Sequence, residues 1–318
     1  MANDAKEYLE SSFLSPLLER PDITDISYNG ERLFYMSNIE GRKRYDLEIN
    51  KSDVSSFLRQ IANLNEKQFS FQCPILDASF SKYRINATFS SLTRVKNEKT
   101  YSFSLRIASE KHVLDNDFFG EGVKEILISI LKEEQSIVIG GTTSSGKTEL
   151  QKWLLLNMKE ACRVIVIDNV EELGLISNPN IDLTTWIVND NIPMASFSSL
   201  VKNSLRNNPD YVFIAEARGK EMFDAIISTM SGHPIIVSVH SLDLESLPER
   251  MARLAMLSEQ KLEMDTLIND IRHHIKFYVY LKKEERDGGI KRYIESIAKI
   301  NDSGVYEYLY RRKQDEKI

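Results

Sequence analysis

The sequence predicts an α/β protein with two domains, in which a smaller α+β domain precedes a larger domain with a mostly parallel sheet. The chain has 318 residues, which is long for a single hydrophobic core and comfortable for two. From about Asp115 onward, helical periodicities alternate with short apolar strands, as expected when helices cover both faces of a parallel sheet. Before that point the strands are short and separated by turn residues, which favours mixed strands around a few helices.

The N-terminal domain is expected to span 1–107 and to be followed by a linker at 108–117. Apolar residues at helical spacing predict helices at 8–18 and about 53–64. Asn29-Gly30 suits a hairpin turn between two short strands. The strands predicted in this domain are 23–28, 32–36, 83–89 and 101–107.

The C-terminal domain is expected to span 118–318 and to hold the parallel sheet. Its predicted strands are 136–139, 164–167, 211–214 and 235–239. Its predicted helices lie near 118–131, from 147 onward, near 195–205, and at 220–230, 244–257 and 265–273. The segments 275–281 and 290–300, on either side of Asp287-Gly288-Gly289, predict an added antiparallel hairpin.

The composition is that of an ordinary soluble globular protein, with 42% hydrophobic and 28% charged residues. No apolar run is long enough to span a bilayer, and the N-terminus lacks signal-peptide features, so we expect a cytoplasmic protein. Cys73 and Cys162 stand far apart, outside any metal-binding spacing. The formal net charge of −6 argues weakly against nucleic acid as the main partner, and no direct nucleic-acid binding is predicted.

A basic stretch lies in the predicted hairpin and contains Lys282, Lys283, Arg286, Lys291 and Arg292. Three acidic residues interrupt it. We therefore interpret it as a solvated hairpin face rather than as a phosphate-binding surface.

The segment Gly141-Thr142-Thr143-Ser144-Ser145-Gly146-Lys147-Thr148 satisfies the phosphate-loop pattern G-x-x-x-x-G-K-[ST] in full. Its glycines let successive backbone N–H groups point at phosphate oxygens, and the following helix adds the positive end of its dipole. Lys147 would reach the β- and γ-phosphates, and the Thr148 hydroxyl would hold Mg²⁺. An apolar strand before the loop and an amphipathic helix after it supply the expected context. The sequence therefore predicts binding of ATP with Mg²⁺.

Carboxylates follow two predicted strands of the same sheet. Glu216 comes just after the strand at 211–214, at the edge where open α/β sheets bind their ligands. There it could polarise the attacking water or hold Mg²⁺, directly or through water. Asp168, Glu171 and Glu172 follow the strand at 164–167 and suggest either a second acidic contributor or a solvated loop.

Two histidines and two arginines flank these strands. His233 and His240 bracket the strand at 235–239 with a spacing of seven, which does not suit a pair of zinc ligands on a helix or tight turn. Arg206 and Arg218 flank the Glu216 strand and could stabilise a transferred phosphate, including one bound to a neighbouring subunit. Ordinary salt bridges explain these arginines equally well.

Four motifs in order make the chain resemble the secretion traffic ATPases, the motors of type II and type IV secretion, type IV pili and competence systems. They are a Walker A motif at Gly141–Thr148, an acidic box at Arg163–Leu173, a Walker B region at Leu205–Gly219 and a histidine box at Ser231–His240. Upstream, Ile23–Gly30, Pro74–Asp77, Tyr83–Asn86 and Ser104–Arg106 resemble that family's N-terminal domain.

The resemblance implies a RecA-like C-terminal domain and a homo-hexameric ring with ATP between the two domains. Hydrolysis would swing the domains and drive inner-membrane secretion or pilus machinery from the inner face of the membrane, where peripheral membrane association is expected. It makes Glu216 and an acidic-box carboxylate, Glu172 or Glu171, the water-activating pair. The resemblance also implies phosphate sensing by the histidine box, with His240 as the sensor and His233 near the nucleotide. N-terminal arginines, here Arg84, Arg94 or Arg106, would touch the nucleotide.

The compact N-terminal domain and the lack of a four-cysteine zinc module favour the type IV secretion and conjugation branch, or the related tight-adherence pilus branch. The chain departs from the family pattern at Asn169, Ala215, Ser231 and Glu149. The leading hypothesis is an export or conjugation ATPase, and a pilus assembly or retraction motor shares all its chemistry. Other classes left open are a nucleotide-binding scaffold with weak hydrolysis, a small-molecule kinase and a nucleic-acid translocase.

Overall fold

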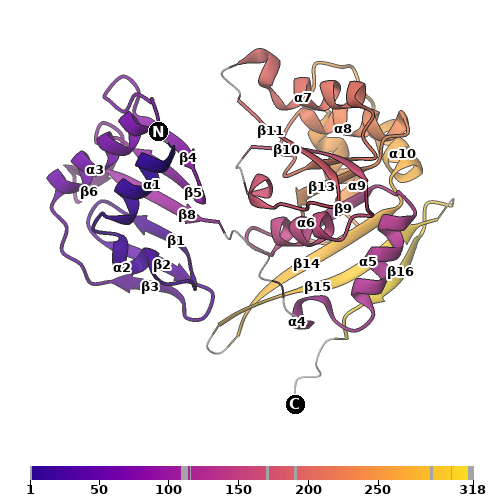
Figure 1. Ribbon diagram of the computed structural model, residues 1–318, viewed down its shortest axis with the longest axis horizontal. Coiled ribbons are helices and arrows are strands. Elements are labelled where there is room, and N and C mark those ends of the chain that lie inside the picture. The colour runs from indigo at the N-terminus through magenta and orange to yellow at the C-terminus, as the bar shows by residue number, and fades with distance from the viewer. Residues whose placement is uncertain are drawn as a thin grey trace. The chain divides into compact units, whose positions relative to one another are not determined.

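The computed structural model describes residues 2–108, 114, 116–169, 172–189, 192–286, 289–301 and 303–313. The chain divides into two compact units, one formed by Met1–Glu110 with Glu285–Lys291 and the other by Lys111–Glu284 with Arg292–Ile318 (Figure 1). Much of the segment predicted as a linker, 108–117, lies outside the described residues, so its linker role stays a prediction.

The first unit is an antiparallel sheet that shares one core with its helices. The strand order is β3-β2-β1-β8-β5-β4. The strands are β1 (Ile23–Tyr28), β2 (Leu33–Ser37), β3 (Gly41–Tyr45), β4 (Ile75–Phe80), β5 (Tyr83–Thr88) and β8 (Ser102–Ile107), with β6 (Arg94–Val95) and β7 (Glu98–Lys99) as a separate short pair. The helices α1 (Ala2–Glu10), α2 (Ser15–Leu18) and α3 (Lys51–Leu64) bury apolar side chains against alternate residues of the strands.

The predicted hairpin between β1 and β2 is confirmed. Tyr28 and Leu33 face each other across it. Gly30 has a φ of +101°, which a residue with a side chain rarely adopts, and the Asn29 side chain accepts hydrogen bonds from the N–H groups of Glu31 and Arg32. By contrast, the helix predicted at 8–18 is wrong as a single element, because the chain turns between α1 and α2.

The second unit is built on an eight-stranded sheet in the order β11-β10-β12-β13-β9-β14-β15-β16. The strands are β9 (Ile137–Gly141), β10 (Arg163–Asp168), β11 (Asp182–Ile187), β12 (Tyr211–Ile214), β13 (Ile235–His240), β14 (Phe277–Arg286), β15 (Gly289–Ile300) and β16 (Tyr306–Arg311). The strands from β11 to β14 pair in parallel, and β15 pairs antiparallel with β16. This confirms the predicted mostly parallel sheet.

Helices cover both faces of this sheet. They are α4 (Asn116–Phe119), α5 (Val123–Lys132), α6 (Lys147–Leu156), α7 (Phe197–Ser204), α8 (Glu221–Met230), α9 (Leu247–Ala255) and α10 (Met264–His274), with short 3₁₀ turns η1 (Leu173–Leu175), η2 (Pro193–Ala195) and η3 (Leu205–Asn207). Ile137 and Phe213 join the core under α5 and α6, whereas Val138 and Val212 join the core under α7 to α10. Strands buried on both faces are therefore apolar throughout, which made them predictable.

The helix predicted near 118–131 is two helices, because the chain breaks at Gly120 and Gly122. Both glycines have positive φ angles, +78° and +74°. A Cβ atom at position 120 would overlap the hydroxyl of Tyr310 on β16, whereas one at position 122 would meet open space. Among the described residues, no helix combines the length and the apolar character needed to cross a membrane.

Candidate functional site

The phosphate-loop motif connects β9 to α6 at the carboxyl edge of the parallel sheet. A Cβ atom at position 141 would lie 2.7 Å from the backbone oxygen of Leu281 on β14, so the loop approaches that strand as only glycine allows. Gly146 has a φ of +102°, and a Cβ atom at this position would lie 3.0 Å from the ring of Phe118. The loop is thus held tightly at both glycines, as a rigid cradle for an anion requires.

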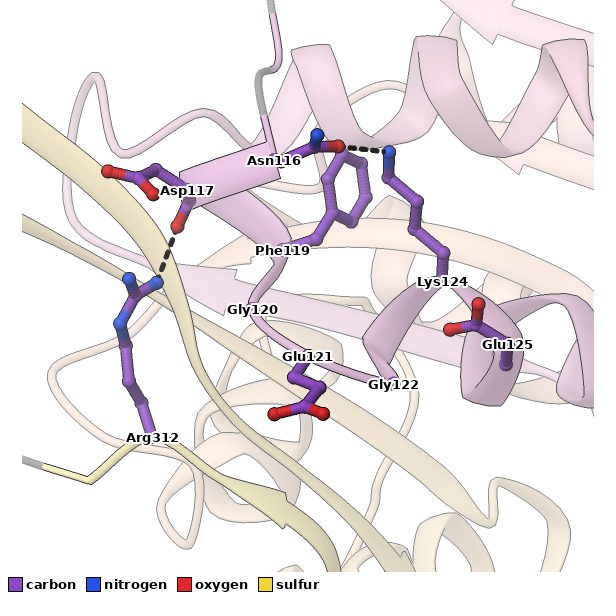
Figure 2. Close-up of a pocket in the computed structure, with 9 residues that line it drawn as sticks. All are labelled: Asn116, Asp117, Phe119, Gly120, Glu121, Gly122, Lys124, Glu125 and Arg312. Atoms are coloured by element: carbon purple, nitrogen blue, oxygen red, sulfur yellow. Dashed lines mark hydrogen bonds between the residues drawn. The ribbon is translucent and has the colours of Figure 1, made fainter.

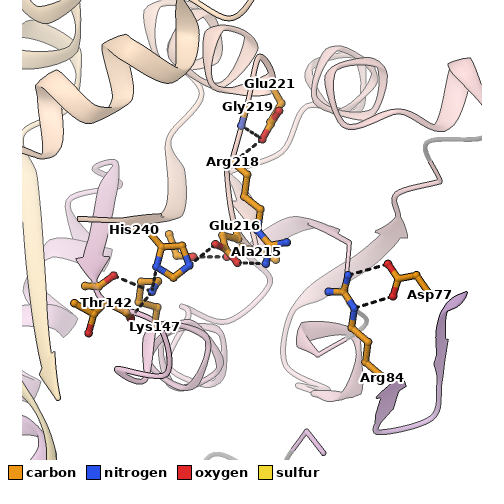
Figure 3. A network of polar contacts seen from close by, with 12 residues as sticks. Asp77, Arg84, Thr142, Lys147, Ala215, Glu216, Arg218, Gly219, Glu221 and His240 are labelled. Atoms are coloured by element: carbon orange, nitrogen blue, oxygen red, sulfur yellow. Dashed lines mark hydrogen bonds and ion pairs between the residues drawn. The ribbon is translucent and has the colours of Figure 1, made fainter. Parts of the chain in front are cut away.

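The side chain of Lys147 is buried within this loop, at 7% exposure. Its Nζ donates to the carbonyl oxygens of Gly141 at 3.0 Å and Thr142 at 2.9 Å, and lies 3.3 Å from Nδ1 of His240 (Figure 3). Ser145 is also fully buried, and its hydroxyl oxygen forms no hydrogen bond within the described residues. Thr148 stands half-buried in the first turn of α6. The loop therefore presents an ammonium group and an unsatisfied hydroxyl, which a phosphate could satisfy.

Glu216 follows β12, next to this lysine. Its carboxylate is 17% exposed, with Oε1 lying 2.7 Å from Nε2 of His240 and Oε2 accepting a 2.6 Å hydrogen bond from Arg218 (Figure 3). Burial opposes ionisation of this carboxyl group, but the Arg218 hydrogen bond and the charges of Arg218 and Lys147 lower the pKa of Glu216 below its ordinary value. Glu216 is therefore ionised at neutral pH and able to accept a proton.

His240 ends β13 and lies directly beside Gly141 of the loop. Burial and the nearby Lys147 lower the pKa of His240 below its ordinary value, although Glu216 opposes the shift. The imidazole is accordingly neutral at pH 7. His233 precedes the same strand at its other end, roughly 20 Å away at the usual rise per residue, so the structure does not bring it to the loop.

Two further side chains hold the peptides around Glu216, and sequence reasoning missed both. Gln151, buried on α6, donates from Nε2 to the carbonyl of Ile214 at 2.8 Å. Ser238, buried on β13, donates to the carbonyl of Ala215 at 2.6 Å and accepts at its own carbonyl from the N–H of Ala217. A polar residue inside the apolar stripe that follows the loop lysine is the signal that could have identified Gln151.

The acidic-box residues lie at the end of β10, the neighbour of β12. Asp168 is fully buried and accepts a hydrogen bond from the N–H of Leu173 at 2.8 Å. Glu172 is 8% exposed at the start of η1. Glu171 lies outside the described residues. The hydrogen bond to Leu173 gives Asp168 a structural task in closing this turn, at whose end Glu172 precedes η1.

The predicted arginines are dispersed over the two units. In the first unit, Arg84 pairs with Asp77 at 3.2 Å, Arg106 lies opposite Arg84 across β5 and β8, and Arg94 is exposed on β6. In the second unit, Arg206 is exposed in η3, and Arg218 bonds Glu216. Within the second unit, the structure brings Arg218 to the Lys147–His240–Glu216 cluster.

A separate hollow of about 380 Å³ lies at the start of α5 (Figure 2). Lys124 donates there to Asn116, and Arg312 donates to the backbone carbonyl of Asp117 at 2.6 Å. Its lining shares no residue with the Lys147–His240–Glu216 cluster. Within the described ranges, no three His, Cys, Asp or Glu side chains are grouped so as to hold a metal ion.

A comparison with protein-family models identifies the family of this chain. Residues 100–272, more than half of the chain, match the family described as "Type II/IV secretion system protein". The chain belongs to this family.

The curated relatives of this chain include a type IV secretion protein, which supports the type IV branch. The uncharacterized protein pXO2-25 of Bacillus anthracis is 29% identical over 95% of this chain and 71% of its own length. The type IV secretion system protein VirB11 of Brucella suis is 35% identical over 40% of this chain, and the match spans only 36% of VirB11.

Solved structures of other proteins share the fold. The ATPase DotB of Legionella pneumophila matches with a TM-score of 0.67 and 18% identity over 95% of this chain and 82% of that one. The pilus retraction motor PilT, solved with bound ADP, matches with a TM-score of 0.62 and 15% identity over 95% and 84% of the two chains. These structures confirm the predicted fold class, and the family match over residues 100–272 confirms the predicted family.

Proposed function

We propose that this secretion ATPase hydrolyses ATP to drive a type IV secretion or conjugation system. The observation that carries the proposal is the position of His240 at the edge of the sheet, 3.3 Å from Lys147 and 2.7 Å from Glu216. Lys147 belongs to the phosphate loop, His240 ends β13 and Glu216 follows β12. Each has the chemistry that phosphoryl transfer to water needs.

The side chains divide the task by their chemistry. Lys147 exchanges the carbonyls of Gly141 and Thr142 for the β- and γ-phosphates, which bind an ammonium group more strongly than neutral carbonyls do. The backbone N–H groups from Thr142 to Thr148, with the N-terminus of α6, surround the phosphates. Glu216 accepts a proton as the oxygen of water attacks the γ-phosphorus, while the bond from that phosphorus to the bridging oxygen breaks and ADP leaves with the electron pair.

Mg²⁺ fits the oxygen donors at this site. The Thr148 hydroxyl is the residue that would hold it, with Glu216 acting directly or through water, and the absence of a dedicated acidic cage among the described residues agrees with a metal held largely by phosphates and water. When bound, Mg²⁺ would neutralise charge on the phosphates.

We further propose that the chain works as a homo-hexamer. Arg206 is exposed and Arg218 is half-exposed, at 52%, so both can reach a nucleotide on a neighbouring subunit. Residues 1–107 would move against 118–318 through the linker at 108–117, and Arg84, Arg94 or Arg106 would contact the nucleotide from the N-terminal domain. The partners would be secretion machinery proteins at the inner face of the membrane, with the ATPase itself peripheral and cytoplasmic.

The first experiment is ATP hydrolysis by the purified full chain over a range of protein concentrations. A ring-forming ATPase gains specific activity as the concentration rises, while Lys147→Ala and Glu216→Gln abolish turnover. Lys299→Ala on β15 serves as a control and keeps wild-type activity, because this half-buried lysine lies over the ring of Phe277 at the start of β14. Tight ATP binding with negligible turnover at every concentration would instead support a nucleotide-gated scaffold. Asn169, which stands at an acidic-box position, favours that alternative.

A pilus assembly or retraction motor is the second candidate, because the fold is shared with PilT. Its chemistry is the same, so hydrolysis cannot separate the two. Capture of the full chain by candidate secretion and pilus machinery proteins, with Glu216→Gln in ATP to hold one state, would discriminate them by partner.

A further inference from the structure

An arginine of the C-terminal hairpin reaches the phosphate loop. Arg292 on β15 donates from Nε to the carbonyl oxygen of Ser144 at 2.7 Å, across 148 positions of the sequence. Its side chain is half-buried. Lys282, from the same basic stretch, behaves as the solvated-face interpretation predicts, because it pairs with Glu295 and Glu284 on the hairpin itself. Arg292 departs from that interpretation.

The contact matters because the carbonyl of Ser144 lies at the turn of the phosphate loop. Ser144 lies at the turn of the loop with a φ of +59°, a left-handed conformation that serine adopts rarely. The carbonyl of Ser144 and the N–H of Ser145 belong to one planar trans peptide, so they point in opposite directions. A donor that holds the carbonyl against β15 therefore fixes the direction of the Ser145 N–H as well.

The N–H of Ser145 can exchange its present acceptor for a phosphate oxygen. It contacts the carbonyl of Thr142 at 3.3 Å, a long hydrogen bond that a charged phosphate oxygen can replace. The side-chain hydroxyl of the same residue, Ser145, is fully buried and forms no hydrogen bond within the described residues. The loop is thus fixed by Gly141 against β14, by Gly146 against Phe118 and by Ser144 against Arg292.

We propose that Arg292 is a positioning residue of the phosphate loop, which holds the Ser144–Ser145 peptide so that the Ser145 N–H meets bound phosphate. The proposal rests on the proposed function, ATP binding at this loop. Arg292 acts through Ser144 and needs no contact with the nucleotide. The planar guanidinium directs its Nε–H in one fixed orientation, whereas a lysine would offer a mobile point charge.

The test compares Arg292→Ala, Arg292→Lys and the control Lys299→Ala, which removes a cation from the same strand. Binding of Mg·ADP to the full chain is measured by calorimetry, and KM and kcat for ATP are measured by phosphate release. We expect the Kd for Mg·ADP and the KM for ATP to rise about tenfold in Arg292→Ala, with kcat within about twofold, and by a smaller factor in Arg292→Lys. Lys299→Ala should match wild type.

Thermal melting separates this role from a merely structural one. Without nucleotide, Arg292→Ala should melt within about 2 °C of wild type, while its stabilisation by Mg·ADP falls. Wild-type KM in Arg292→Ala would overturn the proposal and leave the proposed function standing, as would an equal loss of melting temperature with and without nucleotide. Should Arg292→Ala fail to fold, wild-type KM in Arg292→Lys would overturn it. Failure of the wild-type chain to bind Mg·ADP would overturn both.

Discussion

The Nε2 atom of His240 lies 2.7 Å from Oε1 of Glu216, and the other nitrogen of the same ring lies 3.3 Å from Nζ of Lys147. One neutral imidazole therefore joins the residue that would bind the γ-phosphate to the residue that would accept a proton. A change in the position of Lys147 on phosphate binding would therefore alter the contact of this ring with Glu216.

Replacing His240 should uncouple these two residues. In His240→Ala we expect kcat for ATP to fall by about tenfold or more, with the Kd for Mg·ADP changed by less than about threefold. His233→Ala is the matched control, because His233 belongs to the other end of β13 and should leave both constants unchanged. Equal losses in the two variants would show that the position of His240 at the loop is irrelevant to turnover.

The Ser238 hydroxyl should matter for both stability and turnover. Ser238→Ala leaves the carbonyl of Ala215 without its donor in a buried setting, which should cost about 1–3 kcal/mol in the free energy of unfolding and lower kcat. Ser228 on α8 is equally buried, but its hydroxyl forms no hydrogen bond within the described residues, so Ser228→Ala should be neutral or stabilising. Chemical denaturation of both variants, beside kcat, checks the contrast.

The two described acidic-box carboxylates should separate by phenotype. Asp168→Ala removes the acceptor of the Leu173 N–H and should cost about 1–3 kcal/mol in stability. Glu172→Gln, which keeps the size of the side chain, should lower kcat about a hundredfold, as loss of a general base does. If the nearly isosteric Asp168→Asn lost turnover at unchanged stability, the catalytic assignment would move to Asp168.

The glycines between α4 and α5 offer a matched pair for the packing of β16. Both have positive φ, so either change to alanine costs about 1 kcal/mol in backbone strain. Gly120→Ala also drives its methyl group into the Tyr310 hydroxyl, and should cost about 1–3 kcal/mol more than Gly122→Ala. Denaturation midpoints measure the difference, and equal costs would mean that β16 moves aside freely.

The stability of the N-terminal unit should depend on pH in the acid range through Asp22. Hydrogen bonds from Arg20 and Ser37 lower the pKa of Asp22 to about 2, below its ordinary value of 3.8. A carboxyl group whose pKa is lower in the folded than in the unfolded protein stabilises the fold at any pH above its unfolded-state pKa. This stabilisation is lost as the pH falls through the folded-state pKa. Asp22→Asn should therefore cost about 1 kcal/mol at pH 7, since Arg20 is partly exposed, and the cost should shrink below about pH 4. Asp46→Asn, at an exposed pair with Arg44, is the control and should show no such trend in thermal melts.

The sequence predicted the parts of the fold whose pattern is local. β1 and β12 have the predicted bounds, because their residues are apolar at the positions that the sheet buries. β3 and β11 were missed, since these polar, partly exposed strands carry little apolar alternation and are stabilised by pairing with neighbours distant in the sequence.

The same distinction holds at the candidate site. The phosphate loop and Glu216 carry recognisable local patterns, and the structure brings them together with His240. The contacts of Gln151 with Ile214 and of Arg292 with Ser144 join segments whose proximity depends on the assembled sheet. No local pattern encodes such a contact, so it could not be predicted before the fold was known.

The position of β9 between β13 and β14 has a consequence for the synthesis of the protein. The strand that leads into the phosphate loop leaves the ribosome about a hundred residues before its first neighbour and further still before its second. This apolar strand has two unpaired edges until β13 arrives and one until β14 arrives, and an unpaired edge favours association with other chains. The phosphate loop thus follows the first strand of its sheet to be made, and a nascent chain that stops before Leu281 would expose one edge of this strand.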